Sequence, residues 1–141
     1  MFLDASIVVA ILAQEDDWEM QSARLAQHRG RLFHSPMVRF EASIALAIIG
    51  QVAANPRSNT ELVEGAEQLF DAFMSDLGSS EVNITPQIGR GALVAARRYG
   101  KTAGHKAALN FGDCFSYAAA KSLGVGLLYK GNDFALTDLG E

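Results

Sequence analysis

Three aspartates of this chain stand at positions where a carboxylate commonly does chemistry. Asp4 directly follows an apolar tripeptide, Asp113 opens an apolar helix, and Asp133 follows another apolar run on a tight turn that contains glycine. In open parallel sheets, ligands bind beyond the carboxyl ends of the strands, where such residues meet. Each aspartate also has an ordinary structural explanation, because Asp4 and Asp113 suit helix N-caps and Asp133 suits its own turn. The three acids are therefore informative mainly as a group.

Glu41 is the fourth acid, and its helix makes it harder to explain structurally. Helical spacing places Glu41 on one face together with Met37, Ile44, Ala45 and Ile48. This apolar pattern predicts that the face is buried, while Arg39 points elsewhere. A buried carboxylate is costly unless it is paired or bound to a cation. The alternative is that Glu41 lies at the edge of the apolar stripe and reaches water.

Four carboxylates that converge without matching bases would repel one another, and their pKa values would rise. A divalent cation removes that cost, and oxygen ligands select Mg²⁺ or Mn²⁺ over zinc or copper. Two such ions roughly 3.5 to 4 Å apart can activate a water molecule and stabilise the leaving oxygen of a phosphodiester. The four acids together therefore predict metal-assisted hydrolysis.

Short apolar runs alternate with helical patterns along the chain, and this order would bring the acids together. Strands are predicted over residues 1–3, 32–33, 82–85 and 125–129. Helices are predicted over residues 6–12, 17–28, 36–49, 60–77, 86–100 and 112–123, with Gly30 as a left-handed cap and Gly50 as a stop. Residues 51–59 are the clearest loop, 101–109 a polar connection and 131–139 a turn-rich end. The alternation predicts a three-layer α/β domain around a parallel sheet.

The composition excludes several classes of protein. With 141 residues and 49% hydrophobic residues, the chain fits one ordinary folded domain, which we place at residues 1–141. The single cysteine, Cys114, excludes an internal disulfide and paired-thiolate zinc sites, and we expect it to be a buried structural thiol. The longest apolar run, Ile7 to Ala13, is far shorter than the roughly 18 residues that span a bilayer. We therefore expect a cytoplasmic protein that does not bind membranes.

Four segments together resemble the PIN-domain ribonucleases, and most closely the VapC-type toxins of bacterial type II toxin-antitoxin operons. These segments are residues 3–6 (LDAS), 39–42 (RFEA), 109–114 (LNFGDC) and 128–134 (LYKGNDF). The match covers essentially the whole chain in order and spacing. The resemblance implies a three-layer α/β/α fold with a short parallel sheet of four or five strands. Gly126 departs from the pattern, because relatives often carry proline there, and the presence of a short final strand is left open.

The resemblance also implies a function and a set of roles. Asp4, Glu41, Asp113 and Asp133 would be the acidic quartet that holds Mg²⁺ or Mn²⁺ for endoribonucleolytic cleavage of RNA. Ser6 would be the small hydroxyl residue beside the first acid, and Asn110 the polar residue ahead of the third. The family further implies a homodimer and inhibition by a small antitoxin encoded nearby, whose C-terminal segment blocks the active-site groove.

The net charge of -4 conceals a basic segment. Residues 1–81 carry a net charge of -7, residues 82–132 carry +6, and residues 133–141 carry -3. Candidates for contact with RNA are the cations of the basic segment and a histidine near them, namely Arg90, Arg97, Arg98, Lys101, His105, Lys106 and Lys121. For Arg97 and Arg98 the alternative is strong, because the helix dipole alone favours cations in a last helical turn.

Two other function classes stay open at this point. A catalytically silent binding module would use the same fold to hold an antitoxin, although the presence of all four acids argues against it. A phosphoacceptor domain of receiver or phosphatase type would also carry an Asp after its first strand and a late Lys such as Lys130. That class needs an acceptor Asp on a middle strand, and the sequence shows none there.

Overall fold

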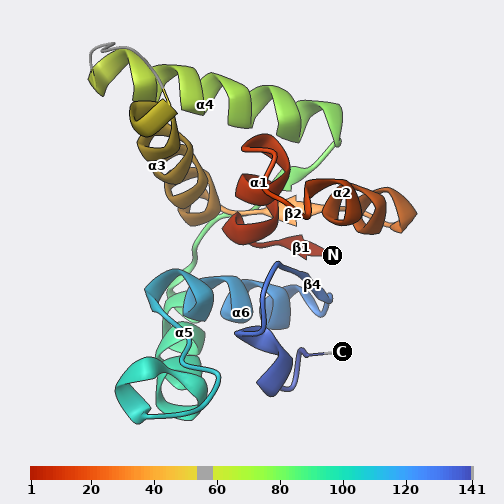
Figure 1. Cartoon of the computed structure of the whole chain (residues 1–141). Coiled ribbons are helices and arrows are strands. Elements are labelled where there is room, and N and C mark those ends of the chain that lie inside the picture. The colour runs from red at the N-terminus through yellow and green to blue at the C-terminus, as the bar shows by residue number, and fades with distance from the viewer. Residues whose placement is uncertain (54–58, 141) are drawn as a thin grey trace.

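The elements alternate along the chain much as the apolar pattern predicts (Figure 1). The computed structural model describes residues 1–53 and 59–140. Its strands are β1 (Phe2–Leu3), β2 (Phe33–His34), β3 (Ser80–Glu81) and β4 (Leu127–Leu128). Its α-helices are α1 (Ala5–Leu12), α2 (Trp18–Gln27), α3 (Pro36–Ala53), α4 (Asn59–Asp76), α5 (Pro86–Tyr99) and α6 (Phe111–Leu123). Two short 3-10 helices, η1 (Lys101–Ala103) and η2 (Phe134–Leu136), complete the described elements.

The four strands form one parallel sheet in the order β3-β2-β1-β4. In the register, Phe2 of β1 lies opposite Phe33 of β2 on one side and Leu127 of β4 on the other. Helices α1 to α4 lie on one side of the sheet, and α5 and α6 lie on the other (Figure 1). This arrangement confirms the predicted α/β class, the three layers and the parallel sheet. The described ranges contain four strands. The short final strand, whose presence the sequence does not decide, is not among them.

Strands β1 and β4 are neighbours in the sheet, and both are short and buried. Phe2 and Leu3 of β1 are completely buried, and Leu127 and Leu128 of β4 are nearly so. Strands covered on both faces by helices read as continuous apolar runs rather than alternating ones, which explains these sequences. The same core includes Phe70 from α4 and Phe134 from η2. Because Phe2 and Phe134 both belong to it, segments near both ends of the chain pack into one core.

Two predicted glycine stops are wrong. Helix α3 continues through Gly50 to Ala53, and a Cβ at Gly50 would lie 3.3 Å from Leu62 of α4. Gly50 thus allows a close approach of the two helices instead of ending one. Gly30 does not adopt a left-handed conformation, since α2 has already ended with His28 in an extended conformation. The predicted loop over 51–59 is correspondingly shorter, because α4 begins at Asn59, and 54–58 lie outside the described residues.

The third strand is also displaced from its prediction. The apolar pattern places it at residues 82–85, whereas β3 consists of Ser80 and Glu81. The backbone N–H groups of Ser80 and Val82 donate to the carbonyls of Leu32 and His34, which flank Phe33, and β2 itself has only two residues. Beyond Val82 the chain turns into α5, whose N-cap Thr85 accepts a hydrogen bond from the Ile88 N–H. The position of the neighbouring strand therefore decided the pairing, not the hydropathy.

Across the described ranges, no helix combines the length and the hydropathy that crossing a bilayer requires.

Candidate active site

Asp4 sits at the end of β1 and caps the first helix. Its Oδ2 accepts hydrogen bonds from the backbone N–H of Ser6 at 3.0 Å and from the Ser6 hydroxyl at 2.6 Å. The side chain is only 4% exposed. The N-cap explanation of Asp4 is therefore correct, and it fixes this carboxylate in one orientation rather than excluding a further role. Ser6 lies beside the first acid, as the resemblance implies.

Asp113 is held in the first turn of α6 by a reciprocal pair of hydrogen bonds. Its Oδ2 accepts from the Asn110 N–H at 2.8 Å, and its own N–H donates to Asn110 Oδ1 at 3.0 Å. This is a capping box, with Asn110 as the N-cap. The pKa of Asp113 is raised to about 6, mainly by burial and also by the charges of Asp4 and Asp133, against the opposing effect of the Asn110 hydrogen bond.

Glu41 reaches the same region from the other side, in the second turn of α3. Its carboxylate lies directly against Gly112 of α6, where an added Cβ would be 1.9 Å from Oε1. The pKa of Glu41 is raised to about 7, mainly by burial and also by the charges of Asp4 and Asp113. Asp4, Glu41 and Asp113 therefore form one electrostatically coupled group assembled from β1, α3 and α6.

The reason for the burial of Glu41 differs from the prediction. The face that it shares with Ile44 and Ile48 is not buried, since Ile48 is 55% exposed. The core-facing residues of α3 are instead Val38, Ala42, Leu46 and Ala47. Glu41 is half-buried because the start of α6 stands opposite it, and not because its own helix face enters the core.

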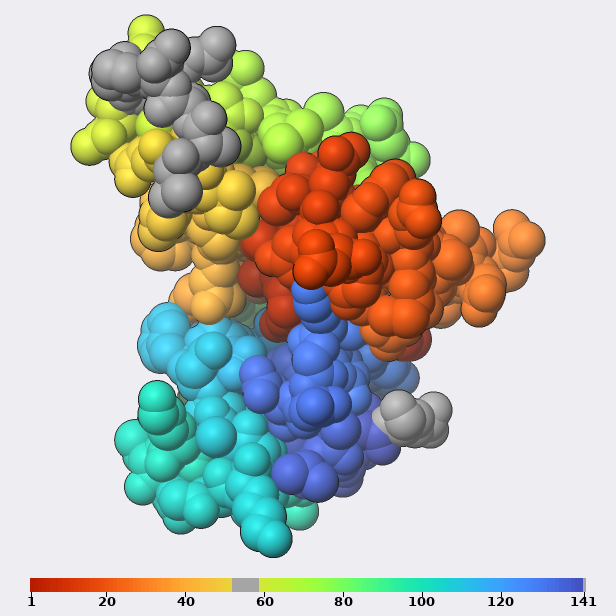
Figure 2. Space-filling model, in the orientation of Figure 1, coloured from red at the N-terminus to blue at the C-terminus, as the bar shows by residue number. Residues whose placement is uncertain are grey.

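The exposed face of α3 lines a groove of about 610 Å³. Glu41, Phe40 and Ile44 form one wall, while Ser6 and Lys130 come from α1 and from the end of β4. The surface is hollowed where the gold and orange atoms of α3 meet the red atoms of α1 (Figure 2). Of the four predicted acids, Glu41 lines this open groove, and the charges of Asp4 and Asp113 act on it.

Asp133 is the least constrained of the four. It is exposed, it precedes η2, and its side chain makes no capping hydrogen bond. Its link to the site is electrostatic, because its charge raises the pKa of Asp113. The turn that carries it contains Gly131 with φ +94°. The fourth acid therefore approaches the group from a solvent-facing turn.

The donor set fits a hard divalent cation. Asp4, Glu41 and Asp113 offer carboxylate oxygens, and no ion pair with a basic side chain involves them in the part of the chain that the structure describes. Asp17, Asp71 and Asp138, by contrast, each pair with a lysine or an arginine. Within residues 1–53 and 59–140, no three His, Cys, Asp or Glu side chains are close enough together to hold a metal ion. Carboxylates that repel one another in the absence of a cation are expected to stay apart in this way.

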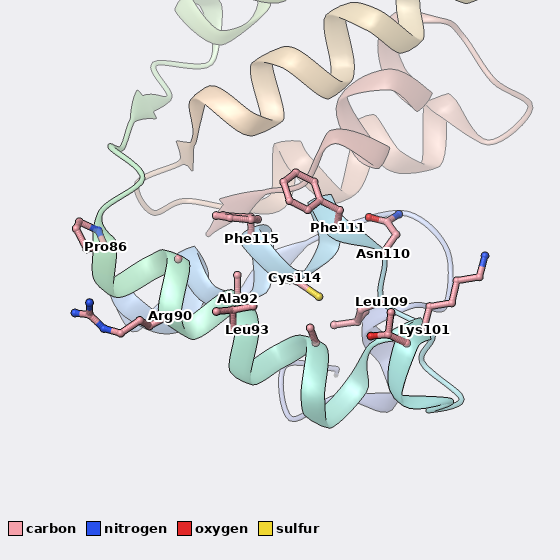
Figure 3. Close-up of a pocket in the computed structure, with 13 residues that line it drawn as sticks. Pro86, Arg90, Ala92, Leu93, Lys101, Leu109, Asn110, Phe111, Cys114 and Phe115 are labelled. Atoms are coloured by element: carbon pink, nitrogen blue, oxygen red, sulfur yellow. The ribbon is translucent and has the colours of Figure 1, made fainter.

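The predicted RNA contacts do not form one continuous patch. Arg90 and Lys101 line a second cavity of about 790 Å³ together with Asn110 and Phe111 (Figure 3). In this view Lys101 extends on the same side as Asn110, whereas the Arg90 guanidinium points to the opposite side. No carboxylate is among the residues that line this cavity.

The other candidates are engaged elsewhere or lie farther along the surface. Arg98 stacks over the Tyr99 ring at 4.9 Å, and His105 packs edge-on against the same ring while its Nδ1 accepts from the Ala107 N–H. Arg97 lines a separate, smaller cavity with Thr102. Lys106 is exposed. Lys121 pairs with Asp138 at 3.1 Å, so its side chain has a structural partner.

Two features of the site were missed from the sequence. The first is Gly112, whose lack of a side chain makes room for Glu41; a glycine in the first turn of a helix beside an acid was a usable signal. The second is the group of charged residues around Lys130, described below, which depends on contacts between distant segments. Cys114 is buried and free, as predicted.

Comparison with known proteins identifies related chains over the full length. The PIN domain family matches residues 1–139. A VapC ribonuclease of Rhizobium meliloti is 49% identical over 140 residues, which cover 99% of this chain and 99% of that protein. A ribonuclease VapC of Mycolicibacterium smegmatis is 34% identical over 139 residues, covering 99% of this chain and 97% of that protein.

Two solved structures share the fold. The Mycobacterium tuberculosis toxin VapC20, described as cleaving the sarcin-ricin loop, superposes with a TM-score of 0.70 at 16% identity and covers 95% of this chain and 92% of its own. A toxin-antitoxin complex from Klebsiella pneumoniae gives a TM-score of 0.66 at 14% identity, covering 98% of this chain and 92% of the other. At these identities the structural matches support the fold alone.

Proposed function

This chain belongs to the PIN-domain family and is a VapC-type ribonuclease toxin, and from that premise we propose that it cleaves RNA with Mg²⁺ or Mn²⁺ bound by Asp4, Glu41, Asp113 and Asp133. The observation that carries the proposal is the coupled group of Asp4, Glu41 and Asp113, which lack a basic partner within the described residues. The raised pKa values of Glu41 and Asp113 are the expected signature of carboxylates that await a cation.

The side chains divide the work between binding and orientation. Asp4 presents its free oxygen to the site because Ser6 occupies Oδ2 with two hydrogen bonds. Asn110 holds Oδ2 of Asp113 in the same way. Bound Mg²⁺ or Mn²⁺ would supply a water molecule of lowered pKa and would neutralise charge on the scissile phosphate. Glu41, with a pKa of about 7 in the metal-free protein, can bind or release a proton near neutral pH.

The partners are part of the same proposal. RNA would enter along the groove beside Glu41, with Lys101 placed to contact its phosphates. Residues 1–141 would act as one nuclease domain within a homodimer. A small antitoxin, encoded nearby, would cover the groove, as membership of the VapC-type toxins implies.

The test is cleavage of total RNA by purified, metal-free protein. We expect cleavage on addition of Mg²⁺ or Mn²⁺ and none in EDTA. Asp113→Asn should lower the rate by about 100-fold or more, beyond the range typical for outer-shell partners of a metal. Asp76→Asn, an exposed aspartate at the end of α4, is the matched control and should cleave like the wild type.

Two results would contradict the proposal. Cleavage that persists in EDTA would exclude the metal-dependent mechanism. Intact RNA under every metal condition, together with retained binding of the antitoxin, would favour the silent binding module instead.

A further inference from the structure

Lys130, the second residue after β4, is enclosed by two carboxylates from the other end of the chain. Its ammonium group lies 2.7 Å from Asp17 Oδ1 and also contacts Glu15 Oε2. Both acids belong to the connection between α1 and α2. With two acceptors already around it, this ammonium is poorly placed to serve as a free cation for a phosphate, although it lines the groove beside Glu41.

Helix α2 holds the preceding residue as well. The Arg24 guanidinium donates to the Tyr129 carbonyl at 3.0 Å and to Gln21 Oε1 at 2.7 Å. The Gln21 amide then donates to Asp17 Oδ2 at 2.8 Å, and Gln21 is almost completely buried. Side chains from residues 15–24 therefore fix both Tyr129 and Lys130. We call Glu15, Asp17, Gln21, Arg24 and Lys130 the strand-end network.

The backbone of Lys130 is connected to two of the four acids. The Lys130 N–H donates to Ser6 Oγ at 3.0 Å, and the Ser6 hydroxyl donates to Asp4 Oδ2. Three residues beyond Lys130 stands Asp133, on an exposed turn without a side-chain capping bond of its own. Lys130 is thus the last firmly held point of the chain before Asp133.

We propose that Lys130 is a positioning residue: its ion pairs with Glu15 and Asp17 fix the end of β4, and thereby orient Asp4 through Ser6 and the turn that carries Asp133. This inference rests on the proposed metal-dependent cleavage. The ion pairs are partly exposed, so they contribute little to folding stability. A displacement of an acid by about 1 Å, in contrast, can lower a rate by roughly 100-fold.

The experiment uses the full chain and compares Lys130→Met with Arg29→Met, which removes one positive charge from an exposed site. For Lys130→Met we expect kcat for RNA cleavage to fall roughly 10- to 100-fold, with KM for RNA unchanged. Calorimetric titration with Mn²⁺ alone, without RNA, should show affinity weakened by about 10-fold. The melting temperature should fall by only a few degrees. Arg29→Met should match the wild type in all four measurements.

Conservative variants separate position from simple loss of charge. Lys130→Arg keeps the cation between Glu15 and Asp17 and should recover part of the lost rate. The double variant Glu15→Gln with Asp17→Asn removes both acceptors but keeps the lysine, and it should reproduce the effect of Lys130→Met. Combining it with Lys130→Met should add little, because coupled residues are not additive. The double variant also provides the test if Lys130→Met fails to fold.

The outcomes distinguish this inference from the proposed function. A wild-type protein that cleaves RNA, beside a Lys130→Met variant equal to Arg29→Met, would overturn the inference alone. A higher KM for RNA with unchanged kcat would also overturn it, because it would make Lys130 a phosphate contact. A wild-type protein that binds Mn²⁺ but cleaves no RNA would contradict the proposed function, while the Mn²⁺ titration would still decide the role of Lys130.

Discussion

The carboxylate of Glu41 lies between two helices, and this location sets its proton affinity. Burial beneath the start of α6 is the larger cause of its raised pKa, and repulsion from Asp4 and Asp113 is the smaller one. In the unfolded chain the Glu41 carboxyl group loses its proton near pH 4.5, whereas in the folded protein it keeps the proton up to about pH 7. The folded state therefore binds more protons than the unfolded state between these pH values, and its stability falls as the pH rises.

This linkage predicts the behaviour of Glu41→Gln. Metal-free wild-type protein should lose stability relative to Glu41→Gln as the pH is raised from 5 to 8, and Mg²⁺ at pH 8 should restore part of the loss. Thermal melts at four pH values measure the difference. Comparing the two proteins cancels other titrations, such as that of His34, whose burial lowers its pKa and acts in the opposite direction. A difference that does not change with pH would show that Glu41 is not desolvated.

At the scale of elements, the start of α6 does most to shape the site. Its capping box places Asp113, and the preceding residue, Gly112, leaves the space that the Glu41 carboxylate occupies. Strand β1 delivers Asp4 to the same place because its parallel neighbours end at the same edge of the sheet. Asp4 and Asp113 are more than 100 residues apart in sequence, and Glu41 lies between them, but the three acids meet where one strand ends and two helices begin.

Gly112→Ala tests this packing. The new Cβ would overlap Glu41 Oε1, and the flexible glutamate would have to swing away. We expect cleavage to fall roughly 10- to 100-fold while the melting temperature changes little, because only the end of one side chain must move. Gly65→Ala in α4, where an added Cβ meets no atom within 4 Å, is the control and should keep full activity. Unchanged cleavage by Gly112→Ala would mean that the observed position of Glu41 is not required.

At the scale of the whole molecule, charge is divided between the two sides of the sheet. The acidic first 81 residues supply helices α1 to α4, and the basic residues 82–132 supply α5 and α6. By the proposed function, an RNA strand in the groove would meet the four acids in the middle and most of the exposed cations on the α5 and α6 side. Such an arrangement favours selective contacts over general attraction to nucleic acid.

Within the basic segment, the different surroundings of Lys101 and Arg98 predict that they contribute unequally to RNA binding. Lys101→Ala should raise KM for RNA several-fold and reduce its dependence on salt, because Lys101 extends beside Asn110 (Figure 3). Arg98→Ala should have a smaller effect, since Arg98 is stacked on Tyr99. Cleavage rates measured across a range of RNA and salt concentrations compare the two variants. Equal effects of both substitutions would indicate a diffuse basic surface.

The sequence by itself determined the class of fold, the order of the elements and the identity of the four candidate acids. These features are local: an apolar run followed by an acid, a helix with its cap, and a short motif such as LNFGDC are all visible in neighbouring residues. Helix α5, with Thr85 before it and Gly100 after it, was predicted to within one residue at its C-terminal end for the same reason.

Only the tertiary structure decided the features that depend on contacts between distant segments. It moved the third strand to Ser80–Glu81, where β2 offers backbone partners, and it carried α3 through Gly50 against α4. It also showed that Glu41 is desolvated by α6 rather than by its own helix, and that Glu15 and Asp17 enclose Lys130. Hydrogen bonds and desolvation act over a few ångströms in space, so residues 115 positions apart can determine each other's role without any local signal in the sequence.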